Sequence, residues 1–191
     1  MDAAVEVFAE AGYEGASFGK IAKRAGVSRP VVYDHFPSKA DLHLLLLERE
    51  RDRILDHVAQ RLQAAQEPDR GVAAAFDAFF SYVEQHPYAW RMLFRETAGD
   101  SDMAEAQRHI QDQAHMAVAT MLAKAPDSRL LTGSDHAVRL EMLAAIWGSA
   151  ANGLARWWYD HRDVDRNELI AVSMDALWLG LQTLRLGERW S

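Results

Sequence analysis

The residues from Ser28 to Phe36 combine basic, aromatic and hydroxyl side chains at a spacing that suits contacts with a polyanion. Val32 and Phe36 are four residues apart, so in a helix they form one buried stripe. The opposite face would present a guanidinium, a phenol and an imidazole, which can donate hydrogen bonds to base edges and phosphates in a major groove. The residues on that face are Arg29, Pro30, Tyr33 and, at its edge, His35.

A second helix is expected just before this segment, joined to it by a tight turn. Ser17 is a suitable N-cap for that helix because its hydroxyl can accept a bond from a free backbone N–H. Gly26 supplies the turn, since glycine adopts positive φ without steric cost. Ser28 is expected to cap the helix that follows. This arrangement predicts a helix-turn-helix that binds double-stranded DNA.

The charge distribution supports a polyanion partner for this segment alone. Residues 17–39 contain five Lys or Arg and one Asp, a local net charge of +4, whereas the whole chain carries −7. A basic region on an acidic protein is the expected electrostatic footprint of DNA binding. The alternative is a solvated three-helix subdomain whose lysines only maintain solubility. The predicted DNA-contacting residues are Ser17, Lys20, Ser28, Arg29, Pro30, Tyr33, His35 and Lys39.

Three pieces of the N-terminal sequence, FAEAGYEG, IAKRAGVS and VYDHFPSKADL, occur in register. With them, the stretch from Ala11 to Leu42 resembles the DNA-binding domain of the TetR/AcrR family of transcriptional regulators. The resemblance covers about the first quarter of the chain. It implies a homodimer that binds a palindromic DNA operator, with a helical effector domain after the DNA-binding head.

Hydrophobic periodicity predicts an all-α chain of about nine helices, without strands or repeats. Residues 1–45 are assigned to a helix-turn-helix DNA-binding domain, a three-helix head, and residues 46–191 to a helical-bundle domain for ligand binding and dimerisation. The first helix is expected to end at Gly12, and the capping patterns at Ser38 and Asp165 predict two later helix starts. The helices expected after the head span about residues 39–65, 72–85, 88–97, 103–124, 135–160 and 166–187.

The composition excludes several classes of function. The 191 residues contain no Cys, which excludes disulfides, a thiol nucleophile and a thiolate metal site. His109 and His115 are six residues apart and cannot share a helix face as i, i+4 metal ligands do. No catalytic grouping or phosphate-binding glycine loop stands out, so we expect neither an enzyme nor a cofactor or metal site. No apolar run is long enough to cross a bilayer, and we expect a cytoplasmic protein without a membrane partner.

The predicted C-terminal domain is rich in aromatic and methionine residues at helical spacing. Such residues are commonly core packing, but they can also line an apolar effector pocket between helices. Because this domain is acidic and a buried unpaired carboxylate is costly, we expect a small, apolar effector that is neutral or cationic. An inward-facing arginine among Arg91, Arg95, Arg139 and Arg156 would change that expectation. The predicted ligand-binding residues are Phe80, Tyr88, Trp90, Phe94, Met116, Met121, Trp147, Asn152 and Trp158.

Two stripes of residues are candidates for an interface between two copies of the chain. Small residues on the helix at 135–160 would let a partner helix approach closely, and the last helix offers a complementary apolar face. Two helices from each chain would then form a four-helix bundle. Packing within one chain is the alternative. The predicted interface residues are Ala144, Gly148, Ala151, Ala155, Leu177, Gly180, Leu181 and Leu184.

Together these patterns predict a DNA-binding transcriptional regulator, more specifically a repressor that a small apolar effector releases from DNA. The effector would stabilise the state of the dimer in which the two heads are wrongly spaced for successive major grooves. Two alternatives fit the same sequence: a DNA-binding dimer that takes no ligand, and a small-molecule binding protein with a vestigial DNA-binding head. The basic segment argues against the second alternative.

Overall fold

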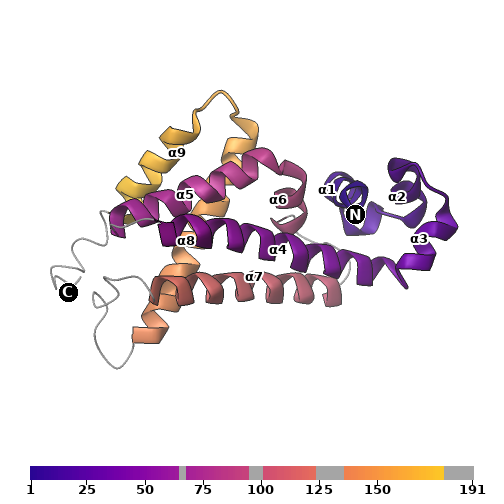
Figure 1. The fold of residues 1–191 in the computed structure, drawn as a ribbon, viewed down its shortest axis with the longest axis horizontal. Helices are drawn as coiled ribbons and strands as arrows, with labels where there is room; N and C mark the ends of the chain where they lie inside the picture. The colour runs from indigo at the N-terminus through magenta and orange to yellow at the C-terminus, as the bar shows by residue number, and fades with distance from the viewer. Residues whose placement is uncertain (65–67, 95–100, 124–135, 179–191) are drawn as a thin grey trace. The chain divides into compact units, whose positions relative to one another are not determined.

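The computed structural model describes residues 1–64, 68–94, 101–123 and 136–178 (Figure 1). Nine α-helices and one π-helical turn occur in these ranges, which contain no β-strand, so the predicted all-α class is confirmed. The helices are α1 (Asp2–Gly15), α2 (Phe18–Ala25), α3 (Arg29–His35), α4 (Lys39–Ala64), α5 (Pro68–Gln85), α6 (Pro87–Phe94), α7 (Ser101–Ala123), α8 (His136–Asp160) and α9 (Arg166–Ser173), followed by the π-helical turn η2 (Met174–Trp178).

Three helices begin at residues whose side chains cap them. Ser17 Oγ accepts a hydrogen bond from the backbone N–H of Lys20 at 3.3 Å, and Ser38 Oγ accepts one from Asp41 at 3.1 Å. Asp165 Oδ1 likewise accepts a bond from the N–H of Asn167 at 2.7 Å at the start of α9. These three caps confirm the predicted helix starts. The predicted end of the last helix near residue 187 lies outside the described residues.

Two glycines in the N-terminal part have left-handed backbone conformations. Gly26 has φ +69° and ends α2, as predicted. Gly12 has φ +72° and forms a kink that interrupts the regular helix within α1 (Asp2–Gly15). With ψ at 175° the backbone of Gly12 is not helical, so the first run of regular helix stops at Gly12 as predicted, and a short further turn follows it up to Gly15.

The chain divides into two compact units, which are considered separately. Unit 1 contains residues 1–53 and 85–113, so α6 and the first half of α7 belong to the same unit as the helix-turn-helix. Unit 2 contains residues 54–84 and the described residues from 114 onward. The division at residue 45 into a DNA-binding domain and an effector domain remains a proposal about function, since α4 contributes to both compact units.

Within unit 1, α1 packs against both α2 and α6. The C-terminal end of α6 is capped by side chains of α7: Gln107 Nε2 and Gln111 Nε2 donate to the carbonyl oxygen of Leu93 at 2.8 and 2.9 Å. Carbonyls at the end of a helix lack intrahelical partners and need such donors. The two glutamines therefore hold the end of α6, the helix that packs against α1.

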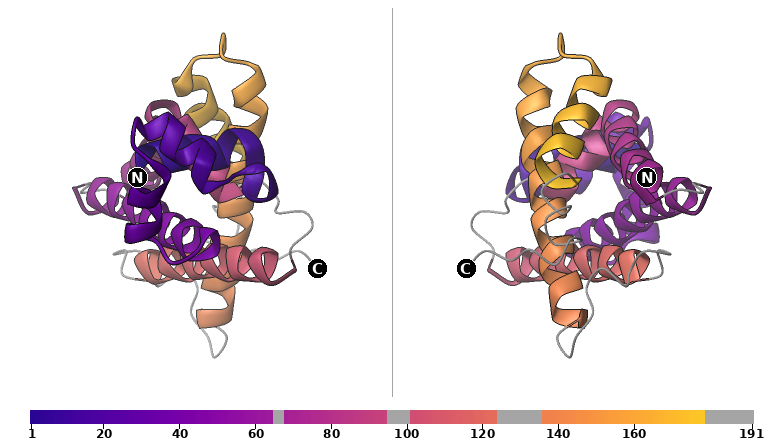
Figure 2. Two further views of the ribbon diagram at one scale, coloured as in Figure 1. Left: turned by 90° about the vertical axis from the view of Figure 1, so that its right-hand side faces the viewer. Right: turned by 90° about the vertical axis from the view of Figure 1, so that its left-hand side faces the viewer.

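Within unit 2, α8 and α9 run side by side and are joined by the turn at residues 161–165 (Figures 1 and 2). The small-residue stripe of α8 points into this unit: Ala144 and Ala155 are 0% exposed, and Ala151 is also buried. A Cβ added to Gly148 would lie only 2.7 Å from Cδ2 of His115 on α7. These residues cannot form a surface for a second copy, so we correct the prediction that they do and adopt packing within the chain.

The last-helix residues of the predicted interface are described only in part. Leu177 lies half-buried in η2, whereas Gly180, Leu181 and Leu184 lie outside the described residues. Over the part of the chain that the structure describes, no helix has the length and apolar character to cross a membrane.

Candidate nucleic-acid interface and effector core

The recognition helix α3 is anchored by one buried side chain and presents the rest. Val32 is buried, and the neighbouring face exposes Arg29, Pro30, Tyr33 and His35. Tyr33 is 54% exposed, yet its ring packs edge-on against Phe18 of α2, with the ring centroids 4.8 Å apart. This contact orients the phenol while leaving its hydroxyl available to a ligand.

The two serines predicted to contact DNA are in different situations. Ser17 uses its hydroxyl as the cap of α2. Ser28 is the N-cap residue of α3, but its side chain makes no capping hydrogen bond. The expected cap by Ser28 is therefore wrong, and its exposed hydroxyl is free to donate to a phosphate oxygen.

Three of the five basic residues in this segment bind other parts of unit 1. Lys20 Nζ donates to the carbonyl of Gly15 at 2.6 Å. Arg24 pairs with Glu6 at 2.6 Å and with Glu10 at 2.7 Å, and these bonds raise the pKa of Arg24 and lower that of Glu10. The charge count of the segment alone therefore overstates the positive charge available to DNA.

Lys39 is the third basic residue with an intramolecular partner. Its ammonium donates to the carbonyl of Tyr13 at 2.8 Å and lies 4.2 Å from the centre of the Tyr13 ring. A lysine carries three N–H donors, so this ammonium can still donate to a phosphate while it holds the end of α1.

Two exposed basic residues, Lys23 and Arg29, have no ion pair or hydrogen bond to the residues that the structure describes. Arg29 was predicted as a contact residue, but Lys23 was not. Lys23 is exposed and faces away from the buried residues Ile21 and Ala22 of α2. In the sequence Lys23 is marked by its charge alone, and the sequence does not show which of the basic residues pair within the protein.

A buried histidine of α4 packs against α1. His43 on α4 is 3% exposed and packs between Phe8 and Tyr13 of α1, with ring centroids 4.4 and 5.2 Å apart. Its Nδ1 is buried without a hydrogen-bond partner. Burial, and to a smaller extent the charge of Lys39, lowers the pKa of His43 from 6.5 to about 4. The folded protein therefore keeps this imidazole neutral.

The predicted ligand-binding residues are distributed over both compact units. Phe80, Trp147 and Trp158 lie buried in unit 2, where they join Phe76 and Trp178 in one aromatic cluster. In this cluster Phe76 contacts Phe80 and Trp147 at ring distances of 6.4 and 6.2 Å. Phe80 contacts Trp158 at 6.3 Å, and Trp147 contacts Trp178 at 6.5 Å. Phe76 is one of the aromatic residues at helical spacing that the sequence offered for a pocket, whereas Trp178 was not predicted for this site.

The remaining candidates lie elsewhere. Trp90 and Phe94 contact each other in α6 of unit 1, with ring centroids 6.2 Å apart. Tyr88 and Met116 are exposed, and Asn152 is half-buried. The side chain of Met121 lies outside the described residues. The aromatic cluster of unit 2 is consequently the part of the predicted effector site that the structure assembles.

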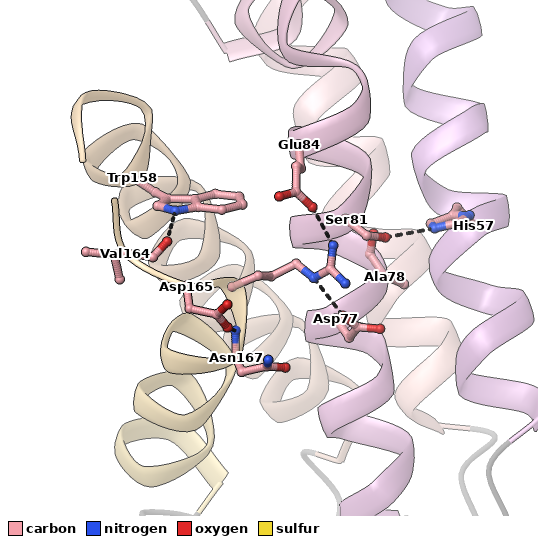
Figure 3. A network of polar contacts seen from close by, with 10 residues as sticks. His57, Asp77, Ala78, Ser81, Glu84, Trp158, Val164, Asp165 and Asn167 are labelled. Carbon is pink, nitrogen blue, oxygen red and sulfur yellow. Dashed lines mark hydrogen bonds and ion pairs between the residues drawn. The ribbon is translucent and has the colours of Figure 1, made fainter. Parts of the chain in front are cut away.

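Polar contacts on α5, and one in the turn between α8 and α9, fix the helices around this cluster (Figure 3). Arg166 of α9 pairs through Nε with Asp77 at 3.0 Å and through Nη1 with Glu84, both on α5. On α4, Nε2 of His57 lies 3.2 Å from Ser81 Oγ. Trp158 Nε1 donates to the carbonyl of Val164 at 2.8 Å, which fixes the turn between α8 and α9.

Comparison with known proteins gives matches over almost the whole chain. Residues 1–45 match the family model described as bacterial regulatory proteins of the tetR family, and residues 68–180 match a tetracyclin repressor-like C-terminal domain. The HTH-type transcriptional activator FasR of Mycolicibacterium smegmatis is 32% identical over 186 residues, which cover 96% of this chain and 82% of FasR. The fatty acid metabolism regulator protein of Bacillus subtilis is 31% identical over 83 residues, 44% of this chain and 43% of that protein.

Solved structures support the same fold at lower sequence identity. The transcriptional regulator FadR from Bacillus subtilis, in complex with stearoyl-CoA, has a TM-score of 0.73 and 18% identity, covering 98% of this chain and 97% of FadR. A TetR-like regulator from Rhodococcus sp. RHA1 has a TM-score of 0.73 and 22% identity, covering 95% of this chain and 92% of that one.

The buried His43 generates a prediction about stability and pH. Its folded pKa of about 4 lies below the unfolded value of 6.5, so the unfolded state binds more protons between these values. The stability contributed by neutral His43 is complete above pH 6.5 and is lost as the pH falls towards 4. We expect this group to lower the free energy of unfolding by about 2 kcal/mol between pH 7 and pH 5.

Urea unfolding at a series of pH values measures this effect. In His43→Leu the free energy of unfolding should change less between pH 7 and pH 5 than in the wild type. In His35→Leu, which alters an exposed histidine, the wild-type pH dependence should remain. An unchanged pH dependence in His43→Leu would show that another group controls acid stability.

The exposed face of α3 generates a second prediction, on affinity for DNA. Tyr33→Phe and Lys39→Ala should weaken binding to all duplexes similarly, because each removes a predicted phosphate contact. Lys39→Ala should also reduce the slope of log K against log salt by about one unit. Fluorescence anisotropy at several salt concentrations measures both effects, with Arg61→Ala, an exposed arginine of α4, as the control. A salt slope equal to that of the wild type would remove Lys39 from the DNA contacts.

Proposed function

Since this chain belongs to the tetR family of bacterial regulatory proteins, and is thus a DNA-binding transcriptional regulator, we propose that it acts as a homodimer on a palindromic operator under the control of a largely apolar effector. The observation that carries the DNA-binding part is the geometry of α3, in which Val32 is buried whereas Arg29, Tyr33 and His35 are exposed. Residues near the start of such a helix contact base edges in the major groove.

A stripe of large apolar residues on α8 supports the proposed homodimer. Val138, Met142, Ile146 and Trp157 are each between 45% and 60% exposed, and their spacing puts them on the helix face opposite Ala144 and the other buried small residues. Val172 on the neighbouring helix α9 is also exposed. Large exposed apolar patches mark interaction sites, and a two-fold interface uses the same patch on both copies. We therefore propose this stripe as the dimer interface in place of the small-residue stripe.

A long-chain acyl compound is the effector class that we propose. The aromatic cluster of Phe76, Phe80, Trp147, Trp158 and Trp178 provides an apolar environment between helices of unit 2, where bundles commonly bind ligands. Two similar proteins support this class by name: a fatty acid metabolism regulator and a regulator in complex with stearoyl-CoA. The acyl chain, including its carbonyl carbon, would occupy the apolar core, and a larger polar group bonded to that carbon would extend into water.

The direction of regulation has two candidates. The sequence favours a repressor that the effector releases from DNA. The name of FasR, a transcriptional activator that is 32% identical, favours activation. Both candidates require the effector to change the affinity for the operator, which separates them from the ligand-independent dimer. An intact and exposed recognition face argues against a vestigial head.

The proposed dimer interface can be tested by introducing a charge. Ile146→Asp should convert the dimer into a monomer that keeps its helical content, because Ile146 is 54% exposed in the single chain and is not needed for the fold. Sedimentation at micromolar concentration measures the mass. Leu45→Asp is the matched control, since Leu45 is an exposed apolar residue of α4 outside the stripe. Leu45→Asp should stay dimeric, and a dimeric Ile146→Asp would show that the interface lies elsewhere.

The regulatory function is tested by selecting operators from a random duplex library and adding acyl ligands. Palindromic sequences should be enriched, and hexadecanoyl-CoA or methyl hexadecanoate should change the affinity of the operator complex at least about fivefold. Free hexadecanoic acid should act more weakly than its ester, because a buried unpaired carboxylate is costly. Run-off transcription from the selected operator then separates repression from activation. Equal operator affinity with and without every acyl ligand would favour the ligand-independent dimer.

A further inference from the structure

Gly19 is the second residue of α2, and a glycine within a helix calls for an explanation. Glycine destabilises a helix relative to alanine, and when it occurs within one it usually has a packing or functional reason. The described glycines with positive φ are Gly12 and Gly26, so the backbone of Gly19 has a conformation that any residue can adopt. Its backbone therefore does not explain the glycine, which leaves the space that a side chain would occupy.

The space above Gly19 is filled by the side chain of Arg29, the first residue of α3. A Cβ added to Gly19 would lie 3.6 Å from Arg29 Nε, 3.7 Å from Cδ and 3.8 Å from Cζ. These three atoms are the nearest neighbours of that position, so the far part of the Arg29 side chain packs on α2 at Gly19. A side chain longer than alanine at residue 19 would occupy the same volume.

We infer that Gly19 is a positioning residue that sets the orientation of Arg29 for reading a base pair in the major groove. The inference rests on the proposed DNA-binding function and adds to it the α2 surface that holds the arginine. An arginine can bond the O6 and N7 atoms of guanine through two parallel N–H groups, which requires a defined orientation of the guanidinium plane. A flexible arginine must lose rotamer freedom on binding, and support along its stem reduces that loss.

The charges around Arg29 fit this role. Arg24 is paired with Glu6 and Glu10, whereas Arg29 has no ion pair or hydrogen bond among the described residues. Gly19 supports the stem of Arg29 without a polar atom, so the guanidinium N–H groups stay available to DNA. The same position occupied by a carboxylate or an amide would compete with the base for these donors.

The test compares Gly19→Leu with Gly19→Ala in the full-length protein. Leucine is uncharged, so it changes no attraction to phosphate, but it displaces Arg29. Gly19→Leu should lower affinity for the selected operator by about tenfold or more, with affinity for random duplex DNA changed less than about twofold. Gly19→Ala should stay within about twofold of the wild type for both duplexes, because a Cβ at 3.6 Å is in ordinary contact. Both variants should melt at or above the wild-type temperature, since both residues favour helix more than glycine does.

A double-mutant cycle separates positioning from direct interference with DNA. In an Arg29→Met background, where the guanidinium is gone, Gly19→Leu should change operator affinity by less than about twofold. An equal loss in both backgrounds would mean that the leucine itself meets the DNA, and no loss in the wild-type background would mean that Arg29 needs no support; either result overturns the inference. If the wild-type protein enriches no sequence at all, the proposed function fails and this inference fails with it.

Discussion

The seven residues of α3 are too few to form a stable helix by themselves, and the DNA-binding surface depends on how they are held. Val32 is the residue of α3 that is buried, so the helix has a small apolar anchor. The left-handed turn at Gly26 fixes where α3 begins, and the edge contact between Tyr33 and Phe18 fixes its rotation. These contacts connect α3 to α2, so the surface presented to DNA belongs to both helices together.

The basic residues of the head divide into those that hold it together and those that remain free. Arg24 joins α2 to two glutamates of α1, and Lys39 joins the start of α4 to Tyr13. Since Glu6 and Glu10 lie outside the segment with the local charge of +4, part of that charge is neutralised by α1. Long-range attraction of DNA by this head is therefore weaker than its local sequence implies, and affinity depends more on oriented contacts.

Features encoded in the backbone were predictable from the sequence, whereas features set by contacts between distant side chains were not. The caps at Ser17, Ser38 and Asp165 and the turn at Gly26 follow from single residue types. Ser28 also looked like a cap, but Pro30 lies at the second helical position and has no N–H to donate. A capping side chain accepts from the N–H of the second or third helical residue, and Pro30 removes the first of these two donors. No sequence rule placed His43 between Phe8 and Tyr13, because that contact joins α1 to α4.

The same limit applies to α8, where two stripes at helical spacing lie on opposite faces of one helix. Small residues permit close approach of another helix. The sequence does not show whether that helix belongs to the same chain or to a second copy. In the structure α7 takes this place, and a Cβ added to Gly148 would lie 2.7 Å from Cδ2 of His115, so the imidazole would have to move to admit it. Once the small residues are buried within the chain, the large residues Met142, Ile146 and Trp157 must face outward. Periodicity identifies both stripes equally well, but the position of α7 decides which of them stays exposed to a partner.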